Sequence, residues 1–318
     1  MRAIPLLTLL LGGWFVVPAH ADEAQDWLTR LGQAEQQQSF HGTFVYERNG
    51  SFSTHNIWHR VQDGKVRERL LQLDGSAQEV VRIDGRTQCV SGILIAGLGD
   101  SSSSTARTLD PQKLKNWYDL AVIGKSRVAG RAAVIVSLTP RDQHRYGFEL
   151  HLDKETGLPL KSLLLNEKGQ LLERFQFTQL DTADVPSDSD LQPGADCKTV
   201  ALDSDKASAI KATQVWRSDW LPPGFELTSS TSRKDPETKT QVNSLMYDDG
   251  LARFSVFLEP LNGATITDTR TQLGPTVAVS RRLTTPQGEM MVTVVGEIPI
   301  GTAERIALSM RSDATATK

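Results

Sequence analysis

Alternating apolar and polar residues fill much of the chain between residues 40 and 180, and this pattern predicts antiparallel β-strands. Within residues 146–177 most alternate residues are apolar, and alternate residues of a strand point to the same face of a sheet. Two polar turns, DKETG at 153–157 and NEKG at 166–169, divide this stretch into three strands. We therefore predict a three-strand meander with one face toward an apolar interior and one toward solvent.

Dipeptides that favour tight turns separate the strands before this meander. An Asn-Gly or Asp-Gly pair begins at residues 49, 63, 74 and 84, after successive stretches of strand-forming residues. Such short connections are typical of an up-and-down antiparallel sheet. The strands are expected at 40–48, 54–61, 65–73, 79–83 and 87–95 and, beyond a loop at 97–106 and a short helix at 111–120, at 125–128 and 132–138.

Helical spacing of apolar residues occurs near both ends of the chain. A helix predicted at 22–38 carries a narrow apolar stripe, which we expect to pack against the large sheet. A second amphipathic helix is predicted at 302–310. Before it, strands are expected at 226–232, 240–247, 252–259, 276–284 and 289–297.

A linker is predicted at 186–211, because this segment is rich in Asp, Ser and Pro and poor in large apolar residues. It divides a large domain at 22–185 from a small domain at 212–318. The predicted fold class is therefore α+β and mainly β, with a large curved antiparallel sheet and a smaller antiparallel sheet covered by one helix.

The first 21 residues have the pattern of a signal peptide. Arg2 precedes an apolar run at 3–17, and residues 19–21 form an A-x-A cleavage pattern. The run is shorter than the roughly 20 residues that a membrane-spanning helix needs, so we expect cleavage before Asp22 and an exported, soluble protein. The formal net charge of −3 gives no reason to expect binding to nucleic acid.

Two cysteines, Cys89 and Cys197, remain after the predicted cleavage site. An oxidising compartment favours a disulfide between them. Two unpaired thiols, one in a strand and one in the linker, fit the sequence equally well, so both interpretations stand.

The sequence contains no motif for catalysis or for a cofactor. It lacks G-x-S-x-G, H-E-x-x-H, C-x-x-C and the P-loop pattern. His55 and His59 would share a strand face, but their Cα atoms would lie about 13 Å apart, too far for one metal ion. The carboxylates of Asp248 and Asp249 lie at a predicted turn, where solvated charges are usual. We therefore predict neither an enzyme, nor a metal site, nor a cofactor.

The apolar face of the large sheet has two interpretations. Its side chains either fill a core or line a cleft for an apolar ligand beneath the helices. Basic residues near it either bind phosphate at a rim or form a solvated face. The candidate lining residues are Phe44, Tyr46, Ile57, Leu71, Leu150, Leu164 and Phe175, and the candidate rim residues are Arg60, Arg67, Arg69, Arg82 and Arg86.

Four segments together resemble the MucB/RseB family of periplasmic regulators. They are SFHGTFVYER at 39–48, LDKETGLPLKSLLLNEKG at 152–169, WLPPGF at 220–225 and LMYDDGLARFSVFLE at 245–259, and the resemblance covers the whole predicted mature chain. The D-x-x-T-G-L-P-L piece is also similar to periplasmic lipoprotein carriers of the LolA type. The resemblance implies a LolA-like, unclosed β-barrel with covering helices, followed by a smaller carboxy-terminal domain.

The resemblance also implies a function in the periplasm. Members of this family bind the periplasmic part of a membrane-spanning anti-sigma factor of the MucA/RseA type and shield it from a protease. Lipid-like ligands, including lipopolysaccharide fragments, are expected to release it. The alternative is a periplasmic lipid or lipoprotein carrier, which would need no second domain, and a homodimer is left open. In the small domain we expect partner contacts at Trp220, Tyr247, Arg253 and Phe254.

Overall fold

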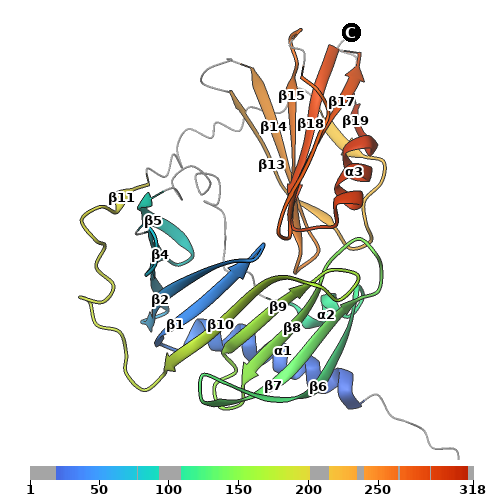
Figure 1. The fold of residues 1–318 in the computed structure, drawn as a ribbon. Helices are drawn as coiled ribbons and strands as arrows, with labels where there is room; N and C mark the ends of the chain where they lie inside the picture. Colours follow the sequence, from blue (N-terminus) through green and yellow to red (C-terminus); the bar gives the residue numbers. More distant parts are fainter. Residues whose placement is uncertain are drawn as a thin grey trace, which may run out of the picture.

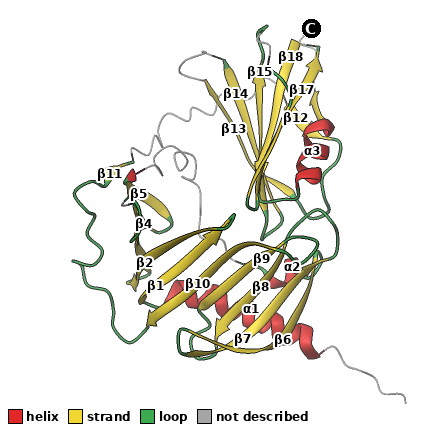
Figure 2. Cartoon of the chain, in the orientation of Figure 1, coloured by secondary structure: helices red, strands yellow, loops and turns green. Residues whose placement is uncertain are grey.

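The computed structural model contains one large sheet, one smaller sheet and a few helices (Figures 1 and 2). Among the residues that it describes, no helix is long and apolar enough to cross a membrane. The predicted loop at 97–106 and most of the predicted signal peptide lie outside the described residues, as do residues 201–211 of the predicted linker. The described residues are 19–76, 78–92, 109–200, 215–234, 240–263, 266–286 and 288–313.

The large sheet is antiparallel and has 11 strands. They are β1 (Phe40–Arg48), β2 (Ser51–Gln62), β3 (Lys65–Gln72), β4 (Glu79–Ile83), β5 (Arg86–Val90), β6 (Tyr118–Val128), β7 (Arg131–Pro140), β8 (Gly147–Asp153), β9 (Pro159–Leu165), β10 (Leu171–Asp181) and β11 (Lys198–Thr199). Their order is β11-β5-β4-β3-β2-β1-β10-β9-β8-β7-β6, so the edge strands β11 and β6 are not paired with each other. The sheet therefore curves without closing (Figure 1), as predicted.

Helix α1 (Ala19–Gln37) lies against the inner face of this sheet. Its apolar residues recur at the spacing of one helix side, so Ala24, Leu28 and Leu31 all enter the same core. Nearer its end, Ala34 joins a second cluster with Phe40 and Phe44 of β1 and with Phe177 and Leu180 of β10. The predicted packing of the first helix against the sheet is confirmed.

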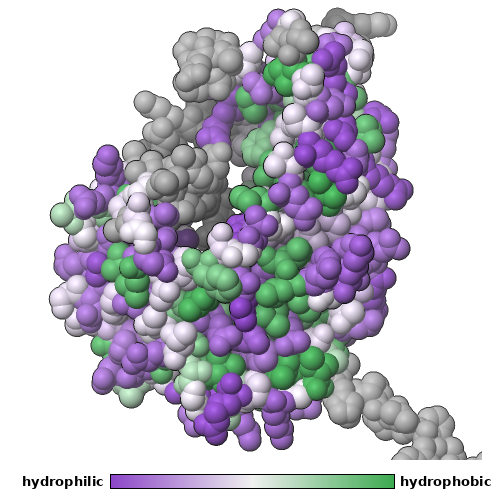
Figure 3. All heavy atoms as spheres, in the orientation of Figure 1, coloured by the Kyte–Doolittle hydropathy of each residue, from purple (hydrophilic) through white to green (hydrophobic). Residues whose placement is uncertain are grey.

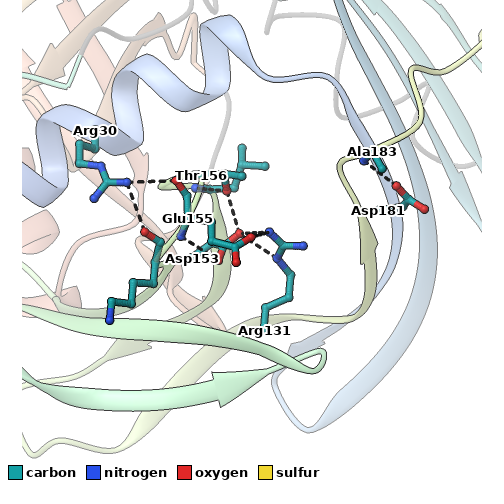
Figure 4. A network of polar contacts seen from close by, with 9 residues as sticks. Arg30, Arg131, Asp153, Glu155, Thr156, Asp181 and Ala183 are labelled. Carbon is teal, nitrogen blue, oxygen red and sulfur yellow. Dashed lines mark hydrogen bonds and ion pairs between the residues drawn. The ribbon is translucent and has the colours of Figure 1, made fainter.

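The DKETG turn between β8 and β9 holds α1 in place (Figure 4). Asp153 is 1% exposed and accepts hydrogen bonds from Arg131 on β7 and from the Thr156 hydroxyl. Arg30 of α1 donates to the carbonyl oxygens of Lys154 and Glu155, at 3.3 and 3.2 Å. The D-x-x-T-G-L-P-L piece therefore has a structural role in this protein, since it fastens a helix across the sheet.

The predicted helix at 111–120 is much shorter than expected. Helix α2 (Pro111–Leu114) is capped by the Asp110 carboxylate, which accepts from the N–H groups of Gln112 and Lys113. Tyr118 begins β6 instead of continuing the helix, because its side chain and that of Leu120 alternate into the core of the sheet. The prediction was wrong because the strand pattern begins before the helical spacing has ended.

Cys89 and Cys197 form a disulfide, with 108 residues between them in sequence. Cys89 lies on β5, and Cys197 immediately precedes β11, which pairs with β5 at the sheet edge. Leu191, in the segment leading to this bond, is 1% exposed. Residues 186–199 of the predicted linker are thus attached to the large sheet, whereas the sequence indicated a solvated connection.

The small domain is a six-stranded antiparallel sheet with one helix. Helix α3 (Ile300–Ser309) packs on β17 and β18, so Ala303, Ile306 and Ala307 close the core on one face. The five predicted strands and the helix are confirmed, while β16, β12 and β19 were not predicted. The strands are β13 (Glu226–Lys234), β14 (Gln241–Asp248), β15 (Arg253–Pro260), β16 (Thr269–Leu273), β17 (Thr276–Thr285) and β18 (Gly288–Gly296), beside a two-stranded ribbon of β12 (Val215–Ser218) and β19 (Met310–Asp313).

Candidate functional site

Six of the seven candidate lining residues share the inner face of the large sheet. Phe44 is buried, and its ring contacts that of Phe175 with the ring centroids 4.7 Å apart. Strand register places the others on the same side. Leu71 does not share this face, because it pairs with Asn56 on β2, whereas Ile57 pairs with Leu70. The candidates on the inner face are Phe44, Tyr46, Ile57, Leu150, Leu164 and Phe175.

Much of this inner face is filled by the protein itself. Leu164 is 5% exposed, and Phe44 and Phe177 pack with α1 residue Ala34. Tyr46, Ile57 and Phe175 pack on that cluster and keep partial exposure. Under α1 the structure therefore agrees with a filled core, and the partly exposed part of the face lies on β1, β2 and β10.

The candidate rim arginines do not form one group. Arg67 and Arg69 alternate with Glu68, so they lie on the outer face, whereas Arg82 pairs with Glu68 and belongs to the opposite face. Arg86 is exposed at the start of β5, where it pairs with Ile83 of β4. Strand register therefore places Arg82 on the opposite face from Arg60, Arg67 and Arg69, so the five candidates do not share one face.

The outer-face arginines bind the chain's own linker. Arg60 donates to the carboxylate of Asp188 at 2.6 Å and to the carbonyl oxygen of Pro186. The Nε atom of Arg69 donates to the buried carboxylate of Glu79 at 2.6 Å. The same carboxylate also accepts a hydrogen bond from the N–H of Gly194. Arg69 donates in addition to the Asp190 carbonyl oxygen, and Arg67 lies 3.5 Å from Asp188. Sequence reasoning missed this use of the arginines.

The four candidate partner contacts fall into two kinds. Tyr247 and Phe254 are 3% and 1% exposed and stack on each other in the core of the small domain, which excludes direct contact with a partner in this conformation. They alternate into the core like their neighbours on β14 and β15. Arg253 is half-buried and bonds Asp248 at 3.0 Å. Trp220 lies at the domain boundary, against His144 and under Arg305.

A buried ion pair joins the two domains. Arg145 lies in the connection between β7 and β8, and its side chain has no exposed surface. Its Nη1 atom lies 2.5 Å from Oδ2 of Asp249, which is equally buried in the turn between β14 and β15. Its Nη2 atom donates to the Pro223 carbonyl oxygen at 2.5 Å. The sequence position of Asp249 indicated a solvated turn residue, and this interpretation was wrong because the side chain is buried.

Aromatic rings and backbone groups enclose this pair. The Arg145 guanidinium lies 5.1 Å from the ring centroid of Phe225 and 5.8 Å from that of Trp117. Burial raises the pKa of Asp249, while the N–H groups of Leu251 and Ala252 and the charge of Arg145 act in the opposite direction. A buried carboxylate of this kind is stable in its charged form only with a partner such as Arg145.

Further contacts extend the junction on both sides of the ion pair. The Tyr146 hydroxyl donates to the Ile298 carbonyl oxygen at 3.1 Å, and His144 Nδ1 lies 3.1 Å from the Thr302 hydroxyl. Leu251 of the small domain packs on the large-domain core. Together with the ion pair, they form what we call the domain junction, whose residues are Trp117, Asp142, His144, Arg145, Tyr146, Pro223, Gly224, Phe225, Asp249, Leu251, Ile298 and Thr302.

Comparison with known sequences decides the family. The profile of the MucB/RseB N-terminal domain matches residues 23–195, and that of the MucB/RseB C-terminal domain matches residues 210–311. The chain belongs to the MucB/RseB family. Family members include the sigma factor AlgU regulatory protein MucB of Pseudomonas aeruginosa, which is 64% identical over the full length of both chains. The sigma-E factor regulatory protein RseB of Escherichia coli K12 is 29% identical over 89% of each chain.

Solved structures of MucB have the same fold. In the complex structure of Pseudomonas aeruginosa MucA/MucB, the matching chain is 64% identical, with a TM-score of 0.83 over 92% of this chain and 100% of that one. A crystal structure of MucB in complex with MucA(peri) gives 0.79 with the same identity and coverage. A crystal structure of MucB gives 0.68 at 60% identity, over 92% of this chain and 98% of the other.

The MucB/RseB family is a family of sigma factor regulators, which agrees with the absence of catalytic motifs from the sequence. Among the described residues, no group of three or more His, Cys, Asp or Glu side chains could hold a metal ion. Within the family fold, the domain junction is the feature that sequence reasoning missed. A sequence signal for it was the presence of Pro223, Phe225 and Asp249 in two of the stretches that carry the family resemblance, 220–225 and 245–259.

Proposed function

We propose that this chain is a periplasmic regulator that binds the periplasmic domain of a membrane-spanning anti-sigma factor of the MucA/RseA type. One observation carries the proposal, namely the 64% identity to MucB across both whole chains, whose solved structures include complexes with MucA. Bound in this way, the chain shields the anti-sigma factor from the protease that begins its degradation. The small domain supports a regulator over a carrier, since a carrier needs the large sheet alone.

Titration calorimetry with the purified MucA periplasmic domain tests the binding. We expect saturable binding, and we expect added chain to slow digestion of that domain by the protease. Pull-down from an envelope extract gives an independent result, because recovery of lipoproteins without an anti-sigma factor would favour the carrier alternative. Failure to bind MucA in calorimetry would end the proposal.

We propose in addition that a lipid-like ligand, such as a lipopolysaccharide fragment, binds the inner face and releases the partner. The partly exposed apolar side chains Tyr46, Ile57 and Phe175 support this site. Because α1 covers the rest of the face, a long acyl chain has to displace part of α1 to enter. The Asp153 turn, which holds α1 to the sheet, opposes that displacement.

Two adjacent leucines provide a matched test of the ligand site. Leu70 faces inward beside Ile57, and Leu71 faces outward beside Asn56. We expect Leu70→Gln to weaken binding of a short-chain lipopolysaccharide severalfold and Leu71→Gln to leave it unchanged, as measured by calorimetry. Equal affinities in both variants would place the ligand elsewhere. By thermodynamic linkage, if the ligand lowers the affinity for MucA by some factor, MucA must lower the affinity for the ligand by the same factor.

A further inference from the structure

Both halves of the buried ion pair are held in shape by their own domains. In the large domain, Asp142 binds Arg145 with both carboxylate oxygens, at 3.1 Å to Nε and 2.9 Å to Nη2. In the small domain, Oδ1 of Asp249 accepts the N–H groups of Leu251 and Ala252, at 2.8 and 2.7 Å. Each residue therefore has hydrogen bonds within its own domain as well as those across the junction.

This arrangement permits the junction to open without unfolding. If the domains separate, Arg145 keeps Asp142 and Asp249 keeps its two backbone donors, and water replaces the contacts that are lost. Docking restores an ion pair in a region of low dielectric, where a misplaced charge is costly. The pair therefore stabilises one relative orientation of the domains and disfavours orientations in which the charges are buried without contact.

The structure resembles the three MucB structures to different degrees. The two complexes with MucA give TM-scores of 0.83 and 0.79, while MucB alone gives 0.68. Coverage of this chain is 92% in each case, and the identities are 60% or more.

We infer that Arg145 and Asp249 are positioning residues for the anti-sigma factor: their ion pair holds the two domains in the orientation to which the partner binds. The inference rests on the proposed function and adds to it the residues through which the orientation is fixed. A ligand of the large sheet can then release the partner by favouring an orientation in which this pair is open, without touching the partner's contacts.

Three variants of the full mature chain test the inference. Asp249→Asn keeps the side-chain oxygen that caps the turn and removes the charge opposite Arg145. Arg145→Met removes the guanidinium but retains much of its apolar volume, and Arg145→Lys retains the charge without the planar geometry. The matched control is Arg131→Met, which breaks the pair of Arg131 with the buried Asp153 inside the large domain and leaves the junction intact.

Two measurements are made on each variant. Small-angle X-ray scattering reports the domain arrangement, and calorimetry reports the dissociation constant of the MucA periplasmic domain. We expect Asp249→Asn and Arg145→Met to enlarge the radius of gyration and to weaken MucA binding about 5- to 150-fold, the usual range for coupled sites. Arg145→Lys is expected to give intermediate values of both quantities. The double variant with Asp249→Asn and Arg145→Met is expected to bind MucA no more weakly than the weaker-binding of the two single variants. Arg131→Met is expected to change neither quantity.

The outcomes separate the inference from the proposed function. If the wild-type chain does not bind MucA, the proposed function fails. If it binds and the junction variants open in scattering but bind MucA with unchanged affinity, the partner does not recognise this orientation and the inference fails. Unchanged scattering in both Asp249→Asn and Arg145→Met would show that the ion pair does not hold the domains. Thermal unfolding by circular dichroism identifies any variant that has lost its fold, and Asp249→Asn carries the test if Arg145→Met does not fold.

Discussion

The inner face of the large sheet and the domain junction are both buried, but they are built from different chemistry. The inner face is mostly apolar: Phe44 and Phe177 pack on each other and with α1 residue Ala34, and Leu164 is buried on the same face. The junction places a charged pair, Arg145 and Asp249, among aromatic rings. Apolar packing tolerates small adjustments, whereas a buried ion pair is stable only in a narrow set of geometries. The first holds a domain together, and the second selects how two domains meet.

The largest effect is expected when a charge is placed on the inner face. Leu164→Asp should lower the free energy of unfolding of the large domain by about 5 kcal/mol, because it removes buried apolar volume and adds an unpaired carboxylate. Leu163→Asp is the control, because the side chain of Leu163 points to the opposite face of the sheet from that of Leu164. Urea unfolding followed by circular dichroism measures both, and equal losses would mean that the assignment of faces is wrong.

A comparable loss in the free energy of unfolding is expected when the disulfide at the sheet edge is removed. Replacing Cys89 and Cys197 by alanine should lower the free energy of unfolding by about 4 kcal/mol, because the bond closes a loop of 108 residues. The measurement is urea unfolding of the double variant beside the wild type. Adding a reductant to the wild type should give the same result, and a reduced protein as stable as the oxidised one would contradict the prediction.

A smaller effect is expected from steric change at the junction. Gly224 has a φ of +86°, and an added Cβ would overlap the Trp117 ring of the large domain. Gly224→Ala should therefore cost about 2 kcal/mol, through backbone strain and the displaced ring. Gly263→Ala is the control, because its φ of +82° is similar and nothing lies within 4 Å of an added Cβ. A difference of less than about 0.5 kcal/mol between the two in thermal unfolding would leave strain as the only cost.

The smallest effect is expected from an exposed ion pair between the domains. Lys113 bonds Glu226 at 2.8 Å, but the two side chains are 35% and 69% exposed. Solvent and salt screen such a pair, so Lys113→Ala should change stability by no more than about 0.5 kcal/mol. Calorimetry with MucA should show unchanged affinity. A loss as large as that of Asp249→Asn would show that charge between the domains matters regardless of burial.

Periodicity predicted the apolar region well, because alternation along a strand depends only on local sequence. The strand at 79–83 was predicted to the residue, and the meander at 146–177 has the expected three strands. Leu71 was assigned to the wrong face because register depends on pairing across the Asp63-Gly64 turn. The helix at 111–120 was too long because two periodic patterns overlap there.

The junction was beyond the reach of the sequence pattern. Asp249 resembles a solvated turn residue until the small domain docks on the large one, and burial then reverses its interpretation. Likewise, the outer arginines appeared to form a free basic rim, although Asp188 and the Asp190 carbonyl oxygen lie against them. Contacts between segments more than 100 residues apart leave no periodic trace, so such sites become visible only in three dimensions. The disulfide could be named as one of two alternatives, and the structure decides between them.

The disulfide also determines how far the small domain travels if the junction opens. The 34 residues from Asp181 at the end of β10 to Val215 at the start of β12 can span at most about 120 Å. With Cys197 bonded to Cys89 at the sheet edge, the 16 residues from Thr199 to Val215 can span at most about 56 Å. A shorter tether raises the local concentration of each half of the junction around the other. We therefore expect the oxidised protein to reclose the junction more readily than the reduced protein.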